Sequence, residues 1–135
     1  MSLPRTGDSR DPWRFGPLTV EDFVRYQGAS GDFNPVHYDV SAARAAGYPG
    51  PFSVGMLAAG LLATYASDWF GPENLRRFAV RFAEQAWPGD ELTFTARVSA
   101  VRDQGSATFV DLELACTRQS GGVHVHGAAT YLLQA

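Results

Sequence analysis

The sequence contains no lysine, and all 11 of its basic residues are arginine. Against 14 acidic residues this gives a formal net charge of −3, so the basic surplus typical of nucleic-acid-binding domains is absent. Cys116 is the single cysteine, which excludes an intrachain disulfide and is typical of a reducing compartment.

Long hydrophobic runs are also missing. No stretch approaches the ~18 uninterrupted apolar residues of a membrane span, and the N-terminus has no apolar segment that resembles a signal peptide. We therefore expect a cytoplasmic protein that does not associate with membranes. Residues 1–16 are rich in Pro, Gly, Arg and Asp and predict an irregular tail, whereas residues 17–135 have the length of one domain.

Helix signals occupy the first half of the domain. Thr19 is expected to cap a short helix, with Asp22 as the reciprocal partner of a capping box, and Gly28 to end it. A second helix of one or two turns is expected to begin at Asp39 or Ser41.

The most apolar segment is "SVGMLAAGLLATYASDWFG", residues 53–71. Ser53 is the expected N-cap, Gly71 the residue after the last turn, and Pro72 the stop. Apolar side chains fall on nearly all faces of this segment, which predicts a buried helix.

From residue 75 onward, four segments separated by turn signals alternate with a period of two, which predicts four antiparallel strands. Cys116 continues the apolar alternation of Leu112 and Leu114 and is therefore expected in the core. A sheet with one solvated face must cover something with the other, and the helix at 53–70 is the candidate. This α+β pattern is that of the hot-dog fold, a long central helix wrapped by an antiparallel β-sheet, although other α+β layouts fit it too.

The stretch "GASGDFNPVHYD", residues 28–39, carries the candidate chemistry. Gly31 permits a positive φ and Pro35 fixes a bend, so Asp32 and His37 can converge on one water as a general acid/base pair. The alternative is a simple turn, in which Asp32 caps a short helix and His37 is an exposed loop residue.

The order of these residues resembles a known signature. "Y-x-x-A-S-G-D-x-N-P-x-H" at Tyr26–His37 is similar to that of the MaoC-like, R-specific hydratase 2 family, which comprises R-specific enoyl-CoA hydratases and (3R)-hydroxyacyl dehydratases. "GML" at Gly55–Leu57 and "VRFAEQAWPGDELTF" at Val80–Phe94 look like two further stretches of that family, in the right order. The resemblance runs through most of residues 18–135.

The resemblance implies a hot-dog fold over residues 17–135, with Asp32 and His37 as catalytic residues and the Gly55 backbone N–H as oxyanion donor. If Ser53 bonded this N–H, the donor would be occupied. The residues implied to contact substrate are Asn34, Ser53, Val54 and Met56. Two positions depart from the family: Val54 stands where histidine is frequent, and Ala63 where some members carry serine.

The reaction implied is the interconversion of trans-2-enoyl and (3R)-3-hydroxyacyl thioesters of coenzyme A or acyl carrier protein, without a metal or other cofactor. A homodimer is implied, with a higher oligomer or a heterodimer as alternatives. A hot-dog thioesterase is a second interpretation, disfavoured by the Asn34-Pro35-x-His37 motif. A non-catalytic partner subunit is a third, disfavoured because Asp32 and His37 are both present.

Two other groups of residues have open interpretations. His124 and His126 lie two apart on a predicted strand and share a face, where they form a metal site with His37 or a carboxylate, or more commonly a partly solvated pair. Three arginines either meet the phosphates of coenzyme A or form a solvated strand edge: Arg76, Arg77 and Arg81.

Overall fold

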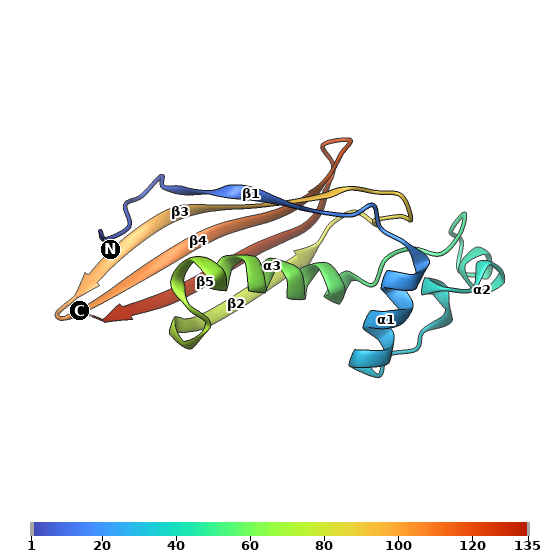
Figure 1. The fold of residues 1–135 in the computed structure, drawn as a ribbon, viewed down its shortest axis with the longest axis horizontal. Coiled ribbons are helices and arrows are strands. Elements are labelled where there is room, and N and C mark those ends of the chain that lie inside the picture. The colour runs from blue at the N-terminus through green and yellow to red at the C-terminus, as the bar shows by residue number, and fades with distance from the viewer. Residues whose placement is uncertain (1, 135) are drawn as a thin grey trace.

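The computed structural model describes residues 2–134, which form a five-stranded antiparallel sheet curved around one long helix (Figure 1). The α-helices are α1 (Val20–Ser30), α2 (Val40–Ala45) and α3 (Gly55–Phe70), with two 3-10 turns, η1 (Pro35–His37) and η2 (Pro72–Asn74). The strands are β1 (Ser9–Phe15), β2 (Leu75–Phe82), β3 (Leu92–Gln104), β4 (Ala107–Arg118) and β5 (Val123–Gln134). Their order in the sheet is β1-β3-β4-β5-β2, so β1 and β2 are the edges. The predicted α+β hot-dog architecture is confirmed.

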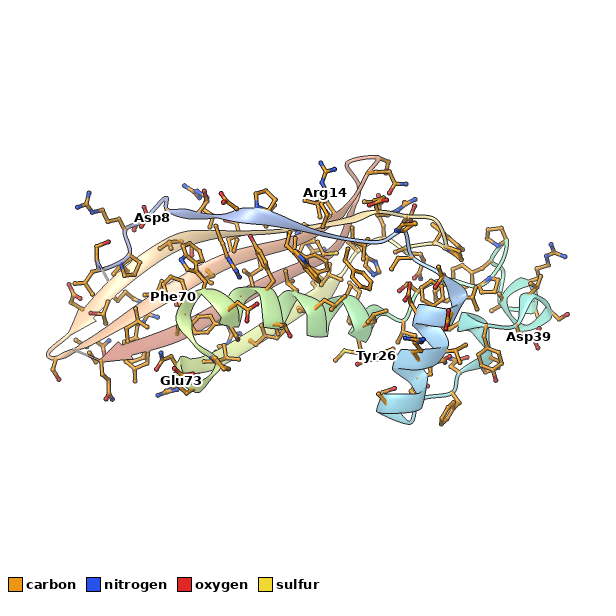
Figure 2. All side chains as sticks on the ribbon, in the orientation of Figure 1. Asp8, Arg14, Tyr26, Asp39, Phe70 and Glu73 are labelled. Atoms are coloured by element: carbon orange, nitrogen blue, oxygen red, sulfur yellow. The ribbon has the colours of Figure 1, made fainter. Side chains whose placement is uncertain are left out.

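The core lies between α3 and the concave face of the sheet (Figure 2). Leu62 is fully buried on α3, and the Phe70 ring lies 5.6 Å from the ring of Tyr131 on β5. The alternation of β4 places Leu112, Leu114 and Cys116 on the same buried face. Each such aliphatic or aromatic side chain contributes about 1.5–3 kcal/mol when fully buried, and most of the buried apolar residues belong to one cluster around this interface.

Cys116 is a core residue, as predicted. Its side chain is fully buried, and that burial raises the pKa of the thiol to about 12. The thiol therefore stays protonated at neutral pH and is not a nucleophile.

Helix α3 is buried on one face only, which corrects the expectation of burial all round. Ala58, Leu62 and Ala66 face the core, whereas Met56 and Gly60 are exposed. The sheet of one chain covers only one side of a helix, so the small and apolar residues on the other side stay open.

The start of α1 is confirmed and its end is corrected. Asp22 N–H donates to Thr19 Oγ1 (3.1 Å) and Thr19 N–H donates to Asp22 Oδ2 (2.9 Å), which completes the capping box. The helix passes through Gly28 and ends at Gly31, which adopts φ +77° while its N–H donates to the Gln27 carbonyl. Gly28 lies inside the helix, because the chain changes direction only at Gly31.

The start of α3 is also corrected. Val54 and not Ser53 occupies the N-cap position, and no side chain caps the helix. The expected end at Gly71 is confirmed, since this residue adopts φ +89° and its N–H donates to the Ser67 carbonyl. α2 begins after Asp39, whose Oδ1 accepts from the Ser41 N–H (2.8 Å).

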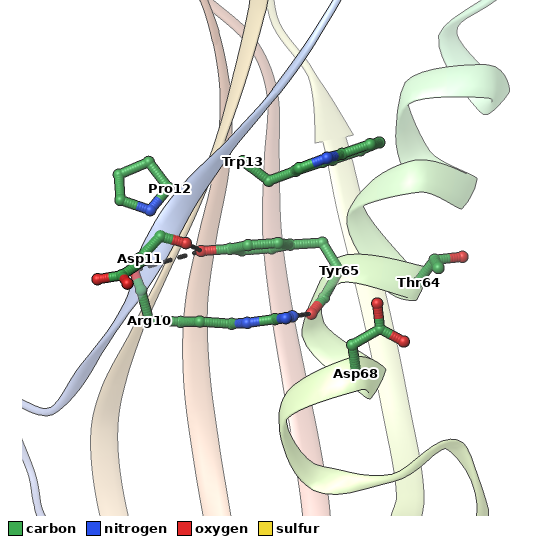
Figure 3. A pocket seen from close by; sticks show the side chains of 7 residues that line it. All are labelled: Arg10, Asp11, Pro12, Trp13, Thr64, Tyr65 and Asp68. Atoms are coloured by element: carbon green, nitrogen blue, oxygen red, sulfur yellow. Dashed lines mark hydrogen bonds between the residues drawn. The ribbon is translucent and has the colours of Figure 1, made fainter.

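The expectation of an irregular tail over residues 1–16 is wrong for Ser9–Phe15, which form edge strand β1 along β3. A bulge between Arg10 and Trp13 interrupts the alternation and places Pro12 where no ladder N–H is needed. The strand is held to α3 by Tyr65, whose hydroxyl donates to the Asp11 carbonyl (2.8 Å). Figure 3 shows the Arg10 guanidinium layered against the Tyr65 ring, 4.8 Å from its centroid.

Among residues 2–134, none of the helices combines the length and the apolar character that crossing a bilayer requires.

At Gly127 on β5, Leu62 of α3 packs closely against the sheet, and this contact yields a test of the packing. A Cβ there would lie 2.9 Å from Leu62 Cδ2 and 3.1 Å from Leu114 Cβ. We expect Gly127→Ala to lower the free energy of unfolding by about 1–3 kcal/mol, the usual range for overpacking. Gly28→Ala, in α1 with open space around it, is the matched control and should gain about 0.5–1 kcal/mol. Urea unfolding measures both, and an equally stable Gly127→Ala protein would contradict this packing.

Candidate active site

A pocket of about 360 Å³ lies at the N-terminal end of α3, where four segments of the chain meet. It is lined by Asp32, His37, Phe52, Ser53, Val54, Gly55, Met56, Phe82, Ala83, Glu84, Gln85 and His124. The structure thus places both members of the predicted acid/base pair, and the predicted oxyanion donor, in one cavity.

The loop after α1 is shaped by short-range hydrogen bonds that bring Asp32 into the pocket. Asp32 Oδ1 accepts from the Asn34 N–H (3.2 Å), and Asn34 Oδ1 accepts from the Val36 N–H (3.2 Å). Pro35 then begins η1, as its fixed φ allows. Two consecutive turns closed by side chains explain why this stretch contains so little helix-forming sequence. The second oxygen of Asp32, Oδ2, has no hydrogen bond to any of residues 2–134.

His37 is buried at 8% exposure, which argues against the interpretation as an exposed loop residue. Its Nδ1 lies 2.8 Å from the Phe52 carbonyl oxygen, and the two rings meet edge to face at 5.0 Å. Because a carbonyl oxygen only accepts, Nδ1 carries the hydrogen and the neutral ring keeps its lone pair on Nε2. The side chain is therefore fixed in the tautomer that a general base at Nε2 requires.

Asn34 does not line the pocket, although we expected it to contact substrate. Its side chain caps η1, and its carbonyl accepts from Gln27 Nε2 (3.0 Å) and from the His37 N–H (3.3 Å). Its side-chain and main-chain carbonyl oxygens therefore hold η1 and join the loop to α1.

The first turn of α3 forms the other wall. Ser53 Oγ makes one long contact, to the Val54 carbonyl (3.5 Å), so Ser53 does not occupy the Gly55 N–H. Within residues 2–134, nothing accepts a hydrogen bond from the Gly55 amide, as expected for the first residue of a helix. A Cβ at Gly55 would lie 2.8 Å from the Phe82 ring, so a side chain there would require this half-exposed ring to move.

The two residues that depart from the family pattern, Val54 and Ala63, lie in different places relative to the pocket. Val54 is buried and lines the pocket, so a histidine there would change its polarity. Ala63 lies two turns further along α3 and does not line it.

The segment after β2 contributes Ala83, Glu84 and Gln85 to the pocket, and the turn that follows it is held by Asp90, a nearly fully buried carboxylate. Its Oδ2 accepts from the Trp87 N–H and from Arg118 Nε, and its Oδ1 from Gln119 Nε2, each at 2.8 Å. Burial acts to raise the pKa of Asp90, but these hydrogen bonds together outweigh it and hold the pKa below its ordinary value. The carboxylate is thus ionised in the folded protein and fixes the turn.

The two C-terminal histidines do not share a site. His124 is 2% exposed and lines the pocket, whereas His126 is half-buried and does not line it. The expectation that they share a face is wrong, because a bulge at the start of β5 interrupts the alternation. Residues 2–134 contain no cluster of three metal-ligating side chains. Arg76, Arg77 and Arg81 are exposed on β2, and none of them lines the pocket.

Comparison with known proteins gives a family match over most of the chain. The model of the MaoC like domain family matches residues 4–117. A peroxisomal hydratase-dehydrogenase-epimerase of Saccharomyces cerevisiae is 40% identical over 79 residues, which are 58% of this chain and 8% of the yeast protein. The chain thus spans only a small part of that relative.

A mitochondrial 3-hydroxyacyl-[acyl-carrier-protein] dehydratase of Arabidopsis thaliana is 27% identical over 117 residues, which are 86% of this chain and 70% of the plant protein. Among solved structures, an (R)-hydratase from A. caviae involved in PHA biosynthesis superposes with a TM-score of 0.84 at 22% identity. That alignment covers 100% of both chains and supports the fold.

The anchoring of the turn at residues 87–90 by Asp90 predicts a pH-dependent loss of stability. Since the folded pKa lies below the unfolded value of about 4, the carboxylate stabilises the fold above that pH and loses its effect as pH falls through the folded pKa. We expect Asp90→Asn to cost about 1.5–3 kcal/mol at pH 7 and less at pH 3. Glu113→Gln, an exposed carboxylate on β4, is the control. Urea unfolding at the two pH values measures this, and a cost independent of pH would refute it.

Proposed function

Because the chain belongs to the MaoC-like family of hydratases and dehydratases, we propose that it interconverts trans-2-enoyl and (3R)-3-hydroxyacyl thioesters. The observation that carries the proposal is the pocket itself, where Asp32, His37 and the Gly55 amide line one cavity. The substrate class is an acyl thioester, on coenzyme A or on acyl carrier protein.

In the hydration direction, Asp32 and neutral His37 hold one water between Oδ2 and Nε2. One of the two takes a proton from the water while the water oxygen bonds to C3. The same group then returns this proton to C2 of the resulting enolate from the same side, so both groups end in their starting protonation states. The reaction adds a water across a double bond, so it needs no oxidant or reductant. Dehydration uses the same groups in the reverse order, as base at C2 and acid at the C3 hydroxyl.

The Gly55 N–H stabilises the negative charge that develops on the thioester oxygen. The first amides of a helix lack intrahelical acceptors and carry a partial positive charge, and neither a capping side chain nor Ser53 uses this one. A donor aimed in advance at a developing oxyanion contributes about 3 kcal/mol to lowering the barrier.

We further propose that the active form is a homodimer. β2 is an edge strand, and the large apolar side chains of Phe82 and Met56 line the pocket while remaining 49% and 52% exposed. A second copy would cover this apolar rim and the open face of α3. The cytoplasmic location expected from the sequence stays a prediction.

Hydration of crotonyl-CoA tests the proposed reaction directly. We expect the enoyl absorbance to fall on addition of the protein and (3R)-3-hydroxybutyryl-CoA to accumulate, as shown by chiral analysis. Asp32→Asn and His37→Ala should each lose about 10²–10⁴-fold in turnover, whereas His126→Ala, on β5 away from the pocket, should not. Near-normal turnover in either pocket variant would refute the assignment. Release of free thiol in place of hydration would identify a thioesterase.

The role of the Gly55 amide is testable with a matched pair. Because any side chain at this position meets Phe82, both proteins carry Phe82→Ala to make room. Proline is favoured at the first position of a helix and removes the N–H, whereas alanine keeps it. We expect Gly55→Pro/Phe82→Ala to show a kcat about 10²–10³-fold below that of Gly55→Ala/Phe82→Ala. Equal kcat values would remove Gly55 from the mechanism.

A further inference from the structure

The pocket contains a second buried imidazole, that of His124, which the proposed reaction does not use. The residue is 2% exposed and lines the same cavity as Asp32, His37 and Gly55. A buried histidine in a pocket wall is an unusual choice where a β-branched residue would fill the space without any polar atom.

A β-bulge places His124 there. On β4, Cys116 pairs with Val125 and the next residue, Thr117, pairs with Val123. His124 is therefore the extra residue on β5, and it is buried together with its neighbour Val125. Bulges reorient a side chain at the cost of a ladder position, and they are frequent beside active sites.

The hydrogen bonding of His124 matches that of His37. Its Nδ1 lies 2.6 Å from the Glu84 carbonyl oxygen, which can only accept, so Nδ1 carries the hydrogen and Nε2 the lone pair. Burial lowers the pKa of His124, the bond to Glu84 opposes this in part, and Arg118 and Asp90 are the charged side chains that act on it. The ring is neutral at pH 7.

The Nε2 atom of His124 is buried and has no hydrogen-bond partner within residues 2–134. Leaving such an atom unsatisfied costs about 1–3 kcal/mol, and the great majority of buried polar atoms are paired. Because the atom is closed to solvent in this conformation, a donor brought by a ligand recovers this cost only if the pocket wall around His124 shifts on binding, and the atom favours ligands that carry a donor.

We infer that His124 is a substrate-binding residue whose Nε2 accepts a hydrogen bond from the amide N–H of the thioester arm. The inference rests on the proposed function. Asp32 and His37 already accept both protons of the attacking water, and one of them accepts the single proton of the C3 hydroxyl. A third acceptor in the same pocket therefore requires a donor elsewhere on the substrate. The pantetheine arm, common to coenzyme A and acyl carrier protein, provides amide N–H groups.

A pair of small substrates tests this inference. Crotonyl-N-acetylcysteamine carries one amide N–H in its arm, and its counterpart with an acetyl ester in place of the acetamide lacks it. We expect the unaltered protein to show a kcat/KM about tenfold higher for the amide. In His124→Phe this preference should fall to about one. His124→Gln, which keeps a donor for Glu84 and an acceptor, should restore part of it. His126→Phe, on the same strand outside the pocket, should keep it in full.

The ratio of the two kcat/KM values separates binding from structural damage, since a distorted pocket lowers both values and leaves the ratio unchanged. An amide preference that survives in His124→Phe, or that is absent from the unaltered protein, would overturn the inference. His124→Val provides the same test if the phenylalanine variant does not fold. If the unaltered protein hydrated neither thioester, the proposed function would fall and this inference with it. If both thioesters are hydrated and the ratio of their kcat/KM values is the same in His124→Phe as in the unaltered protein, only the inference about His124 is rejected.

Discussion

The close approach of α3 to the sheet is the constraint on which the rest of the structure depends. Leu62 reaches the sheet surface at Gly127, where the absence of a side chain on β5 lets the helix come near. This contact fixes the position of the helix, and hence of the amides at its first turn, relative to the ends of β2 and β5. The loops after α1 and after β2 then close around those amides to form the pocket.

Most of the fold was predictable because its signals are local. The capping box of Thr19 and Asp22 and the stop at Gly71 depend on residues within a few positions of each other, and β3 and β4 alternate over most of their length. The strand β1 was missed because a bulge containing Pro12 interrupts its alternation. The end of α1 was misplaced because two glycines were available, and only the path of the following loop selects Gly31.

The candidate site was predictable to a smaller extent. Asp32 and His37 stand in a motif whose order is specific, and both line the pocket. Asn34, in the same motif, supports the turn from outside, because neighbours in a sequence motif need not face the same cavity. His124 had no signal of its own, since its placement follows from a register shift between β4 and β5 that only the pairing of the two strands reveals.

The burial of Cys116 has a practical consequence for measuring activity. The chain has no other thiol, and this one lies in the closed interior, where its pKa of about 12 keeps it protonated and slow to react. Colorimetric thiol reagents would therefore report coenzyme A released from a substrate with little background from the protein. For the same reason, a cysteine introduced at the pocket rim would be labelled selectively by a fluorophore, without first removing the native residue.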